Sequence, residues 1–417
     1  MPRPTPFHAR TSAACHSFLW KEWNGFAAVR AYDGHSEDEY FAVRSRAAVL
    51  DVSPLCKLDV SGPDAARLLS RVFSRDVEKL PERRTTYGVL VDPRGKILDD
   101  GTVAHLEGGV FRLCANERWG SWLRRNARGL DVVIEDTTEL WAALAVQGPA
   151  SRDVLAGLVD FELPAMPFFR CRAATIAGVR GWVSRTGYTG DLGYEVFVAA
   201  ADAERVWDAI LAAGQTRLVV PMGLDALDVV RIEAGFVLSG VDYHGARSAL
   251  VESRKYTPDD AGLGFCVDLD RSTPFCGQAE VLRDRERGPT WDIVGIELDW
   301  AELEGLYHGE GLPPHLAPVA CRIPVPVYAA DGRTQVGQVT SQTWSPVLKR
   351  YLCLASVRRP HHTLDGRLRI EHTVEYERRT VGATVVPRTF FDPPRKREVI
   401  RKSDMTKPPA PRVEEQR

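Results

Sequence analysis

The sequence lacks a strong excess of either charge and any long hydrophobic run. Its 54 Lys and Arg residues nearly balance 56 Asp and Glu residues, which leaves a net charge of −2. A nucleic acid or an anionic membrane would favour a basic surface, so neither is expected as a partner. No segment approaches the roughly 18 apolar residues of a membrane span, and the first residues contain no continuous apolar signal segment. The sequence therefore predicts a cytoplasmic protein.

Common metal and nucleotide motifs are also missing. The eight cysteines are scattered without a C-x-x-C pair, and the ten histidines form no H-E-x-x-H. In a chain of this length such cysteines indicate buried free thiols rather than a disulfide framework or a zinc site. No G-x-G-x-x-G fingerprint occurs, so any flavin would have to come from a partner chain. We expect no metal.

The composition that is present is that of an ordinary globular protein of more than one domain. Of 417 residues, 44% are hydrophobic and 26% are charged. Helical periodicity over 61–80, 116–130, 149–158, 200–214 and 223–235 mixes with β-type runs without regular alternation, which favours an α+β fold. Residues 1–40 are expected to be irregular. We expect a core over 1–290, a small antiparallel β domain over 291–390 and a flexible charged tail over 391–417.

The first candidate site is the pair Asp99–Asp100 in the segment ILDDGTV. Consecutive strand residues face opposite sides, so only one of the two carboxylates is expected to point inward. The motif alone favours an edge strand on which both acids are solvated. The alternative is a buried acid with a shifted pKa, which would suit proton transfer.

The second candidate is Glu195, which follows three turn glycines in SRTGYTGDLGYEVFV. By period 2 it shares a strand face with Phe197, and a carboxylate on an apolar face needs a partner. One hypothesis is an arginine elsewhere in the fold. The other is a ligand that offers two adjacent N–H donors, such as a pterin or a guanidinium.

The third candidate lies in the helix GLDALDVVRIEAG. Asp228 and Arg231 are three residues apart, which is compatible with an ordinary surface ion pair. Arg231 is also flanked by Val230 and Ile232, so a second hypothesis places it near the apolar side. There it would bind a carbonyl or carboxylate group.

These segments resemble the glycine-cleavage T-protein, or aminomethyltransferase, family. The similar segments, in order along the chain, are VLDVSPLCKLDVSGPDA, GKILDDGTV, LAVQGPAS, SRTGYTGDLGYEV, GLDALDVVRIEAGFVLSGVD and VGQVTSQTWSPVLKRYLCLASV. They span about residues 45 to 357. Six elements in the family's order make a chance match improbable.

The resemblance implies a three-domain, ring-like architecture with an α+β core, a C-terminal antiparallel β-barrel and tetrahydrofolate at the centre. Glu195 would hold the pterin edge, and Asp100 would lie beside the reactive nitrogens of the folate as the catalytic acid–base group. Tyr87, Asn116 and Arg231 would contact the cofactor. The implied partner is a small one-carbon donor, with a lipoyl carrier protein as an alternative.

The donor side departs from the family pattern. Pro54, Leu55 and Cys56 replace a usual H-M-G, an arginine is lost near Asp228, and Ser239 replaces an aromatic residue. The resemblance therefore leaves open an aminomethyl donor, demethylation of a small methoxy, methylthio or methylamine compound, or a non-catalytic folate-binding protein. A detached folate module of a larger amine oxidase is a further alternative.

Overall fold

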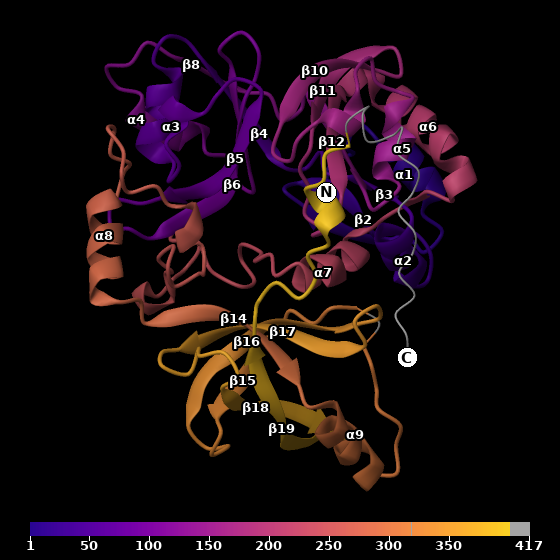
Figure 1. Cartoon of the computed structure of the whole chain (residues 1–417), viewed down its shortest axis with the longest axis vertical. Coiled ribbons are helices and arrows are strands. Elements are labelled where there is room, and N and C mark those ends of the chain that lie inside the picture. The colour runs from indigo at the N-terminus through magenta and orange to yellow at the C-terminus, as the bar shows by residue number, and fades with distance from the viewer. Residues whose placement is uncertain (318, 401–417) are drawn as a thin grey trace.

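The computed structural model describes residues 1–317 and 319–400. Three lobes lie in a triangular, ring-like arrangement, with helix α7 (Leu224–Glu233) between the second lobe and the barrel, as Figure 1 shows. Two lobes combine a β-sheet with helices, and the third is a closed β-barrel. The predicted α+β class, the three-part architecture and the C-terminal antiparallel barrel are thus confirmed.

The first lobe is a five-stranded antiparallel sheet in the order β5-β6-β7-β4-β8. Its strands are β4 (Cys56–Ser61), β5 (Arg84–Val91), β6 (Ile97–His105), β7 (Phe111–Ala115) and β8 (Val133–Asp136). Helices α3 (Ala65–Val72) and α4 (Gly120–Asn126) pack on one face of the sheet through buried apolar side chains such as Leu68 and Leu123. Both helices were predicted, but each is shorter than its periodic segment.

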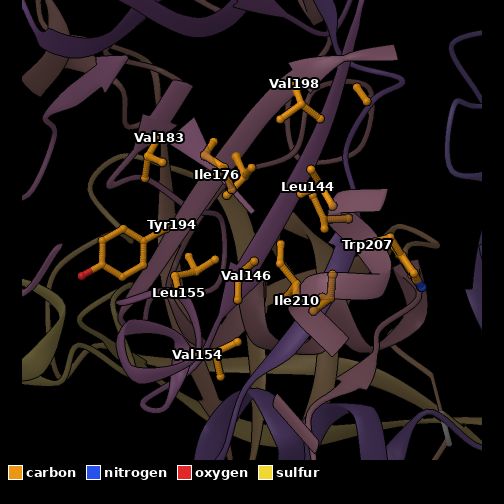
Figure 2. Close-up of a cluster of buried hydrophobic side chains, with 14 of the residues drawn as sticks. Leu144, Val146, Val154, Leu155, Ile176, Val183, Tyr194, Val198, Trp207 and Ile210 are labelled. Carbon is orange, nitrogen blue, oxygen red and sulfur yellow. The ribbon is translucent and has the colours of Figure 1, made fainter. Parts of the chain in front are cut away.

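The second lobe is a six-stranded sheet in the order β10-β11-β12-β9-β3-β13. Its strands are β3 (Ala48–Asp51), β9 (Trp141–Gln147), β10 (Cys171–Ile176), β11 (Val179–Ser184), β12 (Gly193–Ala199) and β13 (Val220–Pro221). Helices α5 (Ser151–Ala156) and α6 (Ala203–Gly214) cover one face. Figure 2 shows the resulting core, in which Leu144 and Val146 of β9 meet Val198 of β12 and Ile210 of α6. Such fully buried apolar side chains each stabilise the fold by about 2 kcal/mol.

The first 45 residues are regular, which corrects the expectation of an irregular N-terminus. They form α1 (His8–Ala14), a hairpin of β1 (Leu19–Trp23) and β2 (Phe26–Ala31), and α2 (Glu37–Ser45). Asn24 and Gly25 form the two-residue hairpin turn with φ angles of 50° and 82°. Asn-Gly is a strong sequence indicator of this turn, because both central residues must adopt positive φ.

The third lobe is a barrel closed in the order β14-β17-β16-β15-β18-β19. Its strands are β14 (Trp291–Leu298), β15 (Val325–Ala329), β16 (Gln335–Ser345), β17 (Arg350–Arg358), β18 (Arg367–Val374) and β19 (Glu377–Val386). Helix α9 (Trp300–Gly309) packs against β19, and α8 (Gln278–Arg287) precedes the barrel beside the first lobe (Figure 1). Among residues 1–317 and 319–400, no helix combines the length and the apolar character that crossing a bilayer would need.

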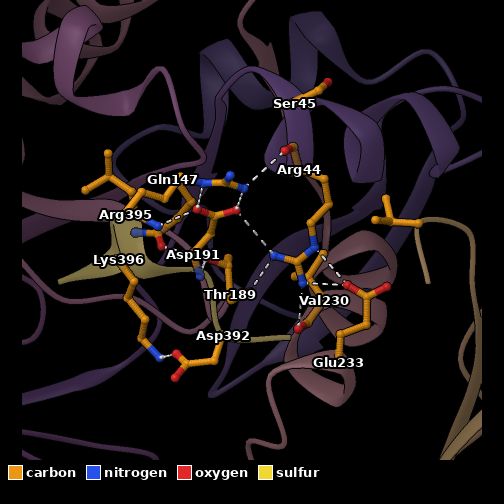
Figure 3. Close-up of polar contacts among 12 residues, drawn as sticks. Arg44, Ser45, Gln147, Thr189, Asp191, Val230, Glu233, Asp392, Arg395 and Lys396 are labelled. Atoms are coloured by element: carbon orange, nitrogen blue, oxygen red, sulfur yellow. Dashed lines mark hydrogen bonds and ion pairs between the residues drawn. The ribbon is translucent and has the colours of Figure 1, made fainter. Parts of the chain in front are cut away.

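Residues 388–400 return from the barrel to the second lobe, and we call this segment the C-terminal strap. Arg395 donates to both carboxylate oxygens of Asp191 at 2.7 Å, and the backbone N–H of Ile400 donates to the carbonyl of Pro164. Figure 3 shows Arg44 between Asp191 and Glu233 at the same place. The predicted flexible tail is therefore wrong for residues 391–400, while 401–417 lie outside the described residues.

Candidate functional site

Asp99 and Asp100 lie on β6, which is an interior strand between β5 and β7. The expectation of a solvated edge strand is therefore wrong. Asp99 is 1% exposed and Asp100 is 9% exposed, so both carboxylates are buried. The two side chains face opposite sides of the sheet as predicted, but both sides of this strand are covered, so both acids are enclosed.

Asp99 has a complete set of hydrogen-bond donors. Its carboxylate accepts from Asn116 Nδ2 at 2.9 Å, Trp119 Nε1 at 2.8 Å and the backbone N–H groups of Glu117 and Asp100, both at 2.9 Å. These four donors favour the ionised form, but burial outweighs them and raises the pKa of Asp99. Asp99 thus fixes the start of α4, and it is an acidic neighbour of Asp100 on β6.

Asp100 is bound by two tyrosines instead. Tyr87 Oη donates to Oδ2 at 2.9 Å, and Tyr243 Oη donates to Oδ1. Asn116 Nδ2 is more distant, at 3.5 Å from Oδ1. Burial, followed by repulsion from Asp99, raises the pKa of Asp100 to about 6 despite these donors. A carboxyl group with a pKa near neutral is suited to proton transfer.

Tyr243 is a site residue that the sequence analysis missed. It lies ten residues beyond the end of α7, is fully buried, and has a pKa raised well above its ordinary value by burial and by Asp100. Its position in the irregular segment after α7 gave no periodic pattern to interpret. Phe265 is a second missed residue, since its ring lies parallel to that of Tyr87 with centroids 6.4 Å apart.

Glu195 lies on β12, on the face opposite the core of the second lobe. Thr186 Oγ1 donates to its Oε2, and Glu195 forms no ion pair with any residue that the structure describes. The hypothesis of an internal arginine partner is therefore wrong for the described residues. Burial raises the pKa of Glu195 and outweighs the opposing effects of Thr186 and Lys57.

The turn glycines before Glu195 make room for Gln147 of β9. An added Cβ at Gly187 or Gly193 would come within 2.0 or 2.2 Å of Gln147 Oε1. Gln147 in turn accepts from Thr189 Oγ1 at 2.9 Å and donates to the carbonyl of Thr186 at 3.2 Å. The glycines thus allow a side chain of the neighbouring strand to hold the turn, which fixes the position of Thr186 against Glu195.

A short path of contacts connects the two acidic positions across the first and second lobes. Ser184 pairs with Glu195 between β11 and β12, and Thr85 Oγ1 of β5 lies 3.5 Å from Ser184 Oγ. Thr85 and Tyr87 are two residues apart on β5, so they share a face of the strand. The sheets that carry Glu195 and Asp100 therefore meet along β5 and β11.

Arg231 is 1% exposed, so the hypothesis of a surface ion pair with Asp228 is wrong. Its guanidinium donates to Asp228 Oδ1 at 2.8 Å, Asp242 Oδ2 at 2.6 Å and Ser341 Oγ of the barrel at 2.7 Å. Burial lowers the pKa of Arg231, but Asp242 and Asp228 outweigh this effect and raise it. Its contacts with protein groups join α7 to the barrel.

Comparison with known proteins agrees with the motifs. A model of the GCVT N-terminal domain matches residues 5–271, and one of the glycine cleavage T-protein C-terminal barrel domain matches residues 313–392. The chain is 36% identical to an aminomethyltransferase of Geobacillus kaustophilus, over 85% of this chain and 90% of the relative. It is 35% identical to a trimethylamine-oxide aldolase of Ruegeria pomeroyi over 95% of this chain, but it spans only 48% of that relative's length.

A solved structure supports the fold. The glycine cleavage system aminomethyltransferase T of Bartonella henselae matches with a TM-score of 0.78 at 22% identity, over 94% of this chain and 99% of that one. The domain models together cover most of the chain, and relatives above 30% identity extend over nearly all of it. The chain therefore belongs to the glycine-cleavage T-protein, or aminomethyltransferase, family of folate-dependent one-carbon transferases.

Proposed function

We propose that this chain binds tetrahydrofolate between its first and second lobes and moves a one-carbon group from a small donor to it. The observation that carries the proposal is the buried carboxyl group of Asp100, which two tyrosine hydroxyls hold and no cation neutralises among the described residues. An acid held by neutral donors stays able to exchange a proton near neutral pH.

The residues present fit a reduced pterin. Glu195 is a half-buried carboxylate with a single described donor, so its remaining lone pairs are available to paired N–H groups of a pterin edge. Tyr87, which binds Asp100, and the largely exposed Phe265 have nearly parallel rings that offer an aromatic surface. Asn116 is turned towards Asp99 and Asp100, so its proposed contact with the ligand would be through a rotated amide or its Oδ1.

Tetrahydrofolate, when bound, supplies the nitrogen that accepts the one-carbon unit. Asp100 in its ionised form would stabilise positive charge next to its carboxylate and would take or return a proton there. Tyr87 and Tyr243 orient that carboxylate by holding one oxygen each. Arg231 is proposed to act indirectly. Its ion pair with Asp242 fixes the residue that precedes Tyr243 in the chain.

The donor is proposed to be a small molecule rather than a lipoyl-linked aminomethyl group. Around the altered donor-side segment, Ser53 and Cys56 are buried and the carbonyl of Pro54 accepts from Asn24 Nδ2 at 3.0 Å. The segment is thus closed in by the N-terminal hairpin. Relatives with an aminomethyltransferase name and one with an aldolase name are about equally similar, so a lipoyl carrier protein is the competing donor.

Product analysis tests the function. Purified protein is incubated without oxygen with tetrahydrofolate and candidate methyl or aminomethyl donors. 5-Methyltetrahydrofolate would show demethylation, whereas 5,10-methylenetetrahydrofolate with release of ammonia would show aminomethyl transfer. Binding of tetrahydrofolate without turnover for any donor, unchanged in Asp100→Asn, would instead show a non-catalytic folate-binding protein.

A further inference from the structure

Lys57 is a buried amine without an acid at ion-pair distance, and burial lowers its pKa. It lies on β4 and is 0% exposed. Its Nζ donates to the carbonyls of Ser53 at 3.0 Å and Leu55 at 2.9 Å, and no carboxylate of the described residues lies within 4.0 Å of it. An ammonium group has three donors, so one remains unused. A buried charge in this state is costly unless a nearby opposite charge offsets it.

Glu195 is the opposite case in the second lobe. Its carboxylate is half-buried and, among residues 1–317 and 319–400, has Thr186 as a donor but no cation in contact. The chain therefore has one buried basic side chain on β4 and one half-buried acid on β12, each without an oppositely charged group in contact. The question is whether the fold brings them to the same place.

Strand register places Lys57 on the face of the first sheet that meets the second lobe. Leu58 and Val60 belong to the core beneath α3 and α4, so Lys57 and Asp59 point the other way. Lys57 pairs with Cys114 of β7, and Asp59 pairs with Arg112.

The other side of this interface carries Glu195. The Arg112 guanidinium lies 4.4 Å from the Trp141 ring centroid and 5.8 Å from that of Phe197, so this face packs directly on the second sheet. Phe197 and Glu195 share one face of β12, two residues apart. Cys114, the cross-strand neighbour of Lys57, is likewise two residues from Arg112, so it shares the face of β7 that packs on the second sheet.

We propose that Lys57 is a positioning residue that supplies a counter-charge to Glu195 across the lobe interface and thereby favours the ionised form of Glu195, which accepts paired N–H donors. The inference rests on the proposed folate site, because it gives the charge of Glu195 a purpose there. Lys57 itself is not proposed to contact the ligand, because its amine is hydrogen-bonded to carbonyl groups of the β3–β4 connection.

Other groups around Glu195 do not supply this charge. Arg112 is already committed to Asp59, with two hydrogen bonds of 2.7 Å, and Thr186 is neutral. Asp51 is the competing acid, since Lys57 also lowers its pKa. Asp51 has its own donors, however, in Thr5 Oγ1 at 2.6 Å and the Ser53 N–H at 2.9 Å.

The test follows the protonation of Glu195 by ¹³C NMR of side-chain carboxyl groups, with the signal assigned by its loss in Glu195→Gln. Lys57→Gln keeps N–H donors for the two loop carbonyls but removes the charge. We expect the titration midpoint of Glu195 to rise by about one pH unit in Lys57→Gln, because a nearby cation favours the carboxylate. Tetrahydrofolate binding needs the ionised form of Glu195. As the pH falls, Lys57→Gln should therefore lose this binding at a higher pH than the wild type does, by the same shift.

The controls separate charge from structure. Lys57→Arg should keep the wild-type titration midpoint of Glu195. If Lys57→Gln does not fold, Lys57→Met takes its place and should show the same rise of the midpoint. An unchanged Glu195 midpoint in the neutral variants, or a shift confined to Asp51, would overturn the inference. If wild-type protein does not bind tetrahydrofolate, the proposed function fails, yet the Glu195 titration still decides the role of Lys57.

Discussion

The acids on β6 and the acids around α7 are all buried, but they have different kinds of partner. Asp100 is held by Tyr87 and Tyr243, which are neutral donors. Asp242 is bound by Arg231 at 2.6 Å, with Thr340 and Ser341 as further donors. An arginine fixes an acid in its charged form, whereas hydroxyl groups leave it able to gain and lose a proton. The comparison separates groups that hold the three lobes together from groups that are available for chemistry.

The largest expected effect on stability is at Arg231. Arg231→Met leaves Asp242 without its cation in a buried place, and it also breaks the contact with Ser341 of the barrel. We expect a loss of about 3–5 kcal/mol in the free energy of unfolding. Urea unfolding measures it, with Arg350→Met as the control, because the half-exposed pair of Arg350 and Glu297 is worth at most about 1 kcal/mol. Equal losses in the two variants would contradict a special role for the buried arginine.

In contrast to Arg231→Met, Asp100→Asn should lose activity without losing stability. Removing the proton-transfer group should lower turnover by about 10²–10⁴-fold. The pKa of Asp100 is raised from 3.8 to about 6 in the folded state. Ionisation of Asp100 therefore lowers the free energy of unfolding of the wild type by up to roughly 3 kcal/mol above pH 6. Asp100→Asn is therefore expected to melt higher than wild type at pH 8, with a difference that shrinks below pH 6 and disappears near pH 4. A variant that melts lower than wild type at pH 8 and keeps full turnover would contradict the role of Asp100 as the proton-transfer group.

Tyr243→Phe tests how hydroxyl donors tune Asp100. Loss of the donor removes an interaction with the carboxylate, so the pKa of Asp100 should rise above about 6. The acid limb of the pH–rate profile should move to higher pH, and the rate near neutral pH should fall by about tenfold. Tyr256→Phe, which loses a hydroxyl bound to Ser356 Oγ at 3.1 Å, serves as the control. An acid limb that stays in place would show that Tyr243 does not act through Asp100.

The smallest expected effect is at the C-terminal strap. Arg395→Met removes the two bonds to the buried Asp191, but Arg44 remains 3.9 Å away, and Arg395 is itself 36% exposed. We expect a loss of about 1 kcal/mol and faster amide hydrogen exchange limited to the strap and the turn at Asp191. Arg397→Met, which changes an exposed pair with Asp392, should leave exchange at that turn unaltered. Uniformly faster exchange throughout the second lobe would contradict a local role.

Local patterns predicted the helices α3 to α7 but missed α1, α2, α8 and α9, and the environment of the charged residues depended on distant contacts. Helical periodicity found α3 and α6 because one face of each is apolar, whereas α7 is buried on several sides and was delimited by Gly223 and Gly235. The aspartate pair was visible as a motif, yet its burial follows from α4 on one side and Tyr243 on the other. The strap looked like a charged tail in the sequence because only the fold shows that Arg395 meets Asp191.

Calorimetric titration of the protein with tetrahydrofolate under anaerobic conditions tests the central claim most directly. We predict saturable binding by wild type, unchanged binding by the control Glu297→Gln on a barrel strand, and binding weakened by about 10–100-fold in Glu195→Gln. No heat with wild-type protein, or equal affinity in Glu195→Gln and wild type, would contradict a folate site built on Glu195.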